Sequence, residues 1–148
     1  MANTMWYAEL EDRVFTVLRT KLNNAISTRY PHLVGKVTYT SDYEVNTSPH
    51  FPAVWFRQID SDEIMEDIYG HSVNGVYMRC QCEVYAQDER TAKRLSYECM
   101  NAMKSMGFSA YFLPKRSASR TGVARFVARY RRNVGADDAL ANGRTNDN

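Results

Sequence analysis

A strand that turns directly into a helix, between Val76 and Phe108, constrains the fold of this chain more than any other stretch. Over positions 76–86, in the sequence VYMRCQCEVYA, apolar residues alternate with polar or tyrosine residues. A two-residue period of this kind is typical of a strand with one buried face. A shift of one position would bury Arg79 and Glu83 instead, so we expect a strongly specified register.

The helix that follows supplies a cover for that buried face. Asp88 is a good N-cap residue, and apolar side chains then recur at helical spacing at Ala92, Leu95, Cys99, Ala102, Met103 and Met106. Gly107 tolerates the left-handed conformation that ends many helices, and Phe108 can fold back onto the last turn. We therefore expect the strand, the helix and its stop signal to form one packing unit.

Weaker patterns predict the other elements. Apolar residues recur every four positions from about Thr4 to Arg29, which predicts an amphipathic helix with Leu10, Val14, Leu18, Leu22 and Ile26 on its buried side. Further strands are expected at 36–40, 51–60, 110–113 and 123–132, with a polar loop at 41–49. The acidic stretch from Ser61 to Gly75 ends in glycines and is expected to be a hairpin loop.

The element order, α-β-β-β-α-β-β, predicts an α+β fold. Because the connections are of hairpin length, we expect an antiparallel sheet of four to five strands with two helices packed on one face. A length of 148 residues suits one domain, expected at 1–134. Residues 135–148 are small and polar without periodicity, so they are expected to form a flexible C-terminal tail.

Compartment signals point to the cytoplasm of the cell that makes the protein. The chain has an odd number of cysteines, and all three lie on expected core positions: Cys80, Cys82 and Cys99. This favours buried thiols in a reducing compartment over disulfides. Met1–Tyr7 lacks a basic start and an apolar run, so no signal peptide is expected. No apolar segment is long enough to predict a membrane span.

Catalytic and metal-binding patterns are missing from the sequence. His32, His50 and His71 fall in expected loops, and no phosphate-binding loop, dinucleotide fingerprint or nucleophile elbow occurs. A zinc site built from the three cysteines and one histidine is conceivable, but the same cysteines satisfy the apolar periodicity without a metal. The sequence therefore predicts a protein that is not an enzyme and that holds no cofactor.

Charge is segregated along the chain although the net charge is only +2. An acidic stretch precedes the central strand, whereas no acidic residue occurs between Asn101 and Ala136. The basic last strand could bind phosphates, contact an acidic protein surface or simply be solvated. If copies joined head to tail, the acidic set of one subunit would face the basic set of the next. This hypothesis makes interface residues of Asp62, Glu63, Glu66, Asp67, Arg125, Arg129, Arg131 and Arg132.

Four stretches resemble the tail terminator, or tail completion, proteins of bacteriophages with long flexible tails. They are PAVWFRQID (52–60), VYMRCQCEVYA (76–86), MGF (106–108) and ARFVARYRR (124–132). The resemblance implies a virion structural protein that is assembled in the host cytoplasm and lies at the head–tail junction. It implies a homo-hexameric ring that caps the tail-tube protein, ends tube polymerisation and presents a joining surface to the head-completion (stopper) protein. Genomic DNA would pass through the ring without specific binding.

Two other functions fit the same residues. A head-closure or neck protein on the head side of the junction is the nearest alternative. A nucleic-acid-binding protein that uses the basic sheet is the second, although Tyr77 and Tyr85 alone do not make the aromatic signature of an RNA-binding sheet. Strong binding to random DNA that falls steeply with salt would distinguish this second function.

Overall fold

The structure, a computed structural model, describes residues 6–40, 50–64 and 75–141. The expected loop at 41–49 and most of the expected acidic loop lie outside these ranges. Along the chain, the described elements are η1 (Trp6–Glu9), α1 (Leu10–Arg29), η2 (Pro31–Leu33), β1 (Thr38–Thr40), β2 (Ala53–Ile64), β3 (Gly75–Ala86), α2 (Glu89–Ser105), β4 (Ser109–Ser117) and β5 (Ala124–Gly135).

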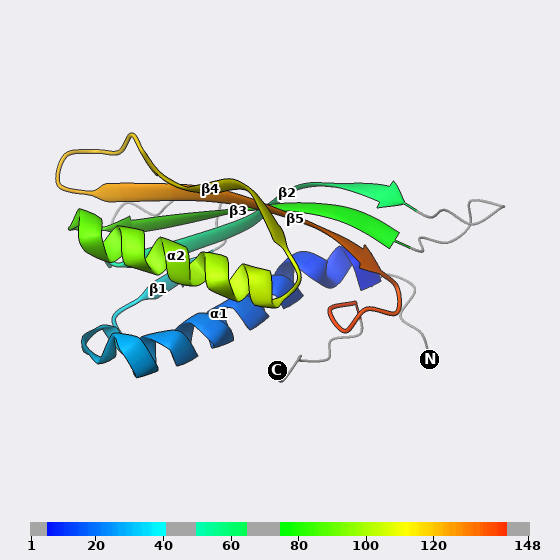
Figure 1. Cartoon of the computed structure of the whole chain (residues 1–148), viewed down its shortest axis with the longest axis horizontal. Helices are drawn as coiled ribbons and strands as arrows, with labels where there is room; N and C mark the ends of the chain where they lie inside the picture. Colours follow the sequence, from blue (N-terminus) through cyan, green and yellow to red (C-terminus); the bar gives the residue numbers. More distant parts are fainter. Residues whose placement is uncertain (1–5, 41–49, 65–74, 142–148) are drawn as a thin grey trace.

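The α+β prediction is confirmed, with both helices on one face of a five-stranded sheet (Figure 1). The strand order is β1-β2-β3-β5-β4. Three neighbouring pairs are antiparallel, as expected, but β1 pairs with β2 in parallel, so the sheet is mixed. The prediction of a purely antiparallel sheet was wrong there because it assumed a hairpin between these strands, whereas a parallel pair requires the chain to return to the same end of the sheet.

The packing unit of β3 and α2 forms as the sequence predicts. Alternate residues of β3 from Val76 to Ala86 are buried against the helices. Asp88 accepts hydrogen bonds from the Thr91 main-chain N–H and hydroxyl, both at 2.9 Å, and so caps α2. At the other end Gly107 has a φ of 88°, and the Phe108 N–H donates to the Met103 carbonyl at 3.1 Å. This is the glycine-dependent helix end expected from the sequence.

The first helix, α1, also lies where its apolar periodicity predicts. The five predicted residues, Leu10, Val14, Leu18, Leu22 and Ile26, are all buried in the core. The first part of the expected helix is a short 3₁₀ turn, η1, in which Trp6 is buried. None of the helices in the described ranges combines the length and apolar character of a membrane span.

The prediction placed the start of the flexible tail, residue 135, too early in the chain. β5 continues to Gly135, and Leu140 and Ala141 lie in the hydrophobic core. Arg13 of α1 donates hydrogen bonds to the carbonyl groups of both residues. The small residues of 135–141 gave no periodicity that marks Leu140 and Ala141 as core residues, but the core accepts both, so the described domain extends at least to residue 141.

Strand lengths also differ from the prediction. β2 runs four residues past Asp60, so the first part of the expected acidic loop is strand. β4 extends to Ser117 although its register against β5 shifts twice. Both extensions contain polar residues, whose pattern alone favours a loop. Pairing with a regular neighbouring strand stabilises these residues as strand.

Candidate functional site

The face of the sheet away from the helices carries most of the candidate residues. On β5, alternate residues (Ala124, Phe126, Ala128 and Tyr130) are buried on the helix side, which is the two-residue period of a strand with one covered face. Arg125, Arg129 and Arg131 therefore lie on the opposite side, which we call the open face. Register pairing places Arg57 and Arg79 beside them. The open face thus gathers five arginines from three adjacent strands.

Glu83 of β3 is the most buried charge on the open face, with 6% of the residue exposed. Its carboxylate accepts hydrogen bonds from Arg125 Nε at 2.6 Å, from the Tyr85 hydroxyl at 2.7 Å and from Gln81 Nε2 at 2.9 Å. Burial, together with the hydrogen bond to Glu83, raises the pKa of Tyr85 to about 12. These three donors satisfy a carboxylate that the alternation pattern alone would leave in solvent.

Arg129 and Arg131 of the open face have uncharged local partners. Arg129 donates to the Gln81 side-chain carbonyl at 2.9 Å and lies 5.8 Å above the Phe112 ring. Arg131 lies 5.7 Å above the Tyr111 ring. Within the described residues neither guanidinium pairs with a carboxylate. Arginines stacked on exposed rings in this way are typical of protein interfaces.

The predicted interface set is only partly brought together. Arg125, Arg129 and Arg131 share the open face, but Arg132 points to the helix side, where it forms a two-point ion pair with Asp138 at 3.2 and 2.6 Å. Arg132 therefore does not share a face with the other arginines, since adjacent residues of a strand face opposite ways, and its place in an interface stays a prediction. A strict count of the alternation from Ala124 would have shown this.

The acidic half of the predicted set is placed in part. Asp62 and Glu63 belong to β2, opposite Tyr77 and Val76 of β3. Glu66 and Asp67 lie outside the described residues. Asp60, which directly precedes this acidic set, is exposed and pairs with Arg79 at 2.8 Å. The acidic segment therefore begins within the sheet and not in a separate loop.

The cysteines give no support for a metal site. Cys80, Cys82 and Cys99 are free and buried, and burial raises the pKa of Cys99 to about 12, well above the range in which a thiolate ligand forms easily. His32 and His50 are exposed. Over residues 6–40, 50–64 and 75–141, no cluster of histidine, cysteine and acidic side chains is arranged to hold a metal ion. The cysteines of the described core act as small apolar residues.

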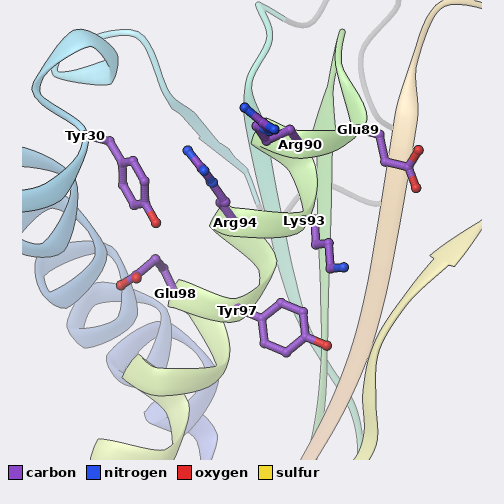
Figure 2. Close-up of a pocket in the computed structure, with 7 residues that line it drawn as sticks. All are labelled: Tyr30, Glu89, Arg90, Lys93, Arg94, Tyr97 and Glu98. Carbon is purple, nitrogen blue, oxygen red and sulfur yellow. The ribbon is translucent and has the colours of Figure 1, made fainter.

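A cleft of about 720 Å³ lies on the outer side of α2, beside the end of α1 (Figure 2). Its lining residues are Tyr30, Glu89, Arg90, Lys93, Arg94, Tyr97 and Glu98. Three of them are exposed cations in the first half of α2, where they repel one another and oppose the helix dipole. Glu98 is buried and pairs with Arg29 at 3.2 Å, so it ties the two helices together. The cleft could accept an anionic group, but its cations are surface residues with no enclosed position for a ligand.

The chain was compared with protein-family models and with curated proteins. No protein-family model matches the chain, and no curated protein matches it. The open face and the charged ends of its strands are therefore interpreted from their own chemistry.

Proposed function

We propose that this chain is a virion structural protein, a tail terminator that caps the tail tube as a homo-hexameric ring. In this role it ends tube polymerisation and provides the surface that joins the tail to the head-completion protein. The proposal is supported by the sequence resemblance over 52–60, 76–86, 106–108 and 124–132. The fold is compatible with that resemblance, since it combines a small sheet with two helices on one face.

The observation that carries the proposal is the pair of open-face arginines that lack a carboxylate partner among the described residues. Arg129 and Arg131 are exposed on a rigid strand, and their described contacts are an amide and two aromatic rings. A partner's carboxylates would give each guanidinium a charged acceptor. Asp60, which is exposed near the end of β2, offers such a carboxylate on a second copy. Contacts between two different patches of identical subunits are those that close into rings.

Nucleic-acid binding is the less favoured function of the same face. Bases stack on exposed aromatic rings, but a guanidinium lies over each of four rings on this face: Tyr77, Tyr85, Tyr111 and Phe112. Glu83 also neutralises Arg125 within the face. A surface of this kind suits carboxylate partners better than a chain of phosphates, and a DNA conduit should not grip its cargo.

The test uses negative-stain microscopy of the cognate tail-tube protein, polymerised with the chain or with its Arg129→Glu/Arg131→Glu variant. The unmodified chain should cap tubes at one end with a ring, whereas the double variant should leave both ends bare, because like charges would then face each other. Lys36→Glu/Lys104→Glu makes the same change in net charge at exposed positions on the helix side and should cap normally.

Three outcomes would contradict the proposal or part of it. Normal capping by the arginine variant would remove Arg129 and Arg131 from the subunit contact. Bare tube ends with the unmodified chain, combined with binding to purified heads, would favour a head-closure protein. Strong, steeply salt-dependent binding to random DNA would favour the nucleic-acid function.

A further inference from the structure

Three consecutive apolar residues are exposed on the outermost strand, β4. Tyr111, Phe112 and Leu113 are 38%, 39% and 60% exposed. β4 ends the strand order on one side, so its outer edge pairs with no described strand. An exposed apolar run on an edge strand promotes association unless a partner covers it. Its presence indicates a surface that is buried in an assembly.

The local geometry of β4 indicates contact through side chains. Its register against β5 shifts between Ala110 and Phe112 and again between Phe112 and Lys115. Pro114 has no N–H to donate, and bulged edge strands pair poorly with a further strand. The three apolar side chains, and not a continuous main-chain ladder, would therefore make the contact.

The opposite edge of the sheet has a smaller apolar feature in acidic surroundings. β1 pairs with β2 only from Ala53 to Trp55, so no described strand pairs with the outer edge of β2 beyond that point. Ile59, at the bulge in β2, is 46% exposed. Glu11 of α1 lies against this edge, where it accepts the Gln58 main-chain N–H at 3.2 Å. Asp60 follows directly and is also exposed.

The apolar residues of the two edges lie at about the same level along the strands. The two edge strands would approach each other antiparallel, and their charges are of opposite sign. Pairing across the sheet aligns Phe112 with Arg129, Gln81 and Arg57, and aligns Ser109 with Arg131, Arg79 and Asp60. The apolar run of β4 therefore lies at about the same level as Ile59. Since β4 runs antiparallel to β5, and β5 runs parallel to β2, side-by-side copies would bring β4 and β2 together antiparallel.

The flanking charges on the two edges have opposite signs. Arg131 lies opposite Ser109 at the start of β4, and Lys115 and Arg116 follow the apolar run at its other end. The β2 edge carries Asp60 at the level of Ser109 and Arg131, with Glu11 beside Gln58. Two β4 edges in a symmetric pair would instead bring basic flanks together. The charges therefore favour a contact between unlike edges.

We propose that Tyr111, Phe112 and Leu113 of one copy dock beside Ile59 on the β2 edge of a second copy, in a head-to-tail contact. This inference rests on the proposed ring and specifies the strand edges that build it. The apolar side chains form the centre of the contact, and the basic and acidic flanks form its rim, as in other protein interfaces.

Site-specific disulfide formation tests the contact directly. Ile59→Cys and Leu113→Cys are prepared as separate variants and oxidised alone, mixed, and mixed in the presence of the tail-tube protein. The mixture should give a covalent dimer, and neither variant should give one alone. The unmodified chain is the control, since its three cysteines are buried and free. The double variant Ile59→Cys/Leu113→Cys should give a ladder that ends at the ring size.

A second measurement keeps the result independent of crosslinking chemistry. Leu113→Ser should weaken self-association, measured by sedimentation, about tenfold or more, while its circular dichroism and melting temperature stay unchanged because Leu113 is exposed. Tyr97→Ser, at another exposed ring on α2, should leave association unchanged.

Each contrary result has a distinct meaning. A dimer from Leu113→Cys alone would show a symmetric β4 contact and overturn the head-to-tail arrangement. No dimer in either mixture would overturn the edge contact. If tubes are nevertheless capped by rings, the proposed function stands without this contact. If the mixture crosslinks but tubes stay bare, the contact stands and the terminator function fails.

Discussion

The covered face and the open face of the sheet differ in how their side chains are satisfied. The covered face is filled by apolar residues such as Met78 and Phe56, neither of which has any exposed surface. On the open face, charged and polar side chains pair with one another. The clearest case is the Glu83 carboxylate, which accepts hydrogen bonds from three donors. Burial of apolar area drives folding from the first face, whereas the second contributes paired polar groups and exposed arginines. Stability should therefore depend on the covered face and association on the open one.

The largest expected effect is on the covered face. Phe56→Ala removes a fully buried ring that stacks on Phe15, and it should lower the free energy of unfolding by about 3–5 kcal/mol. Phe112→Ala, on β4, should cost less than about 1 kcal/mol because 39% of that residue is exposed. Urea denaturation of both variants checks the difference. Equal losses in the free energy of unfolding would mean that both faces of the sheet contribute equally to stability.

An intermediate effect is expected from the buried carboxylate of the open face. Glu83→Ala leaves the partly buried Arg125 without its carboxylate, and it should cost about 2 kcal/mol. Glu83→Ala/Arg125→Met should recover part of this loss, since no unpaired charge then remains. A double-mutant cycle by chemical denaturation measures the coupling. Zero coupling would show that the pair does not stabilise the fold.

The smallest effect compares neighbouring arginines on opposite faces. Arg132→Ala breaks the ion pair with Asp138 and should cost about 1 kcal/mol, with faster hydrogen exchange at the amides of 135–141. Arg131→Ala should stay within about 0.5 kcal/mol, because this arginine is exposed and has no carboxylate partner in the described part of the chain. The reverse ranking would contradict the assignment of Arg132 to a structural role.

Prediction succeeded where a regular period met a clear boundary signal. The alternation over 76–86, the Asp88 cap and the Gly107 stop were enough to place β3 and α2, because each rests on local geometry. Prediction failed where contacts with distant parts of the chain decide the structure. The segment 135–141 is held by a hydrogen bond from Arg13 and by the burial of Leu140 in the core, and the local sequence pattern indicates neither.

The candidate site was predictable as a set of residues but not as an arrangement. The basic run over 124–132 is visible in the sequence, and alternation assigns three of its arginines to one side. The acceptor role of Glu83 was missed, because its donors come from β3 itself and from β5, and a linear pattern does not show which strands are neighbours.

The sequence by itself determined the fold class, the central strand–helix unit, the buried faces of α1, β3 and β5, and the segregation of charge. These properties follow from side-chain periodicity and capping, which act over a few residues. Only the tertiary structure decided the parallel pairing of β1, the burial of Glu83, the separation of Arg132 from the other arginines and the two exposed edges. Strand order and register decide such features, and both depend on which distant segments pack best together and not on any one segment alone.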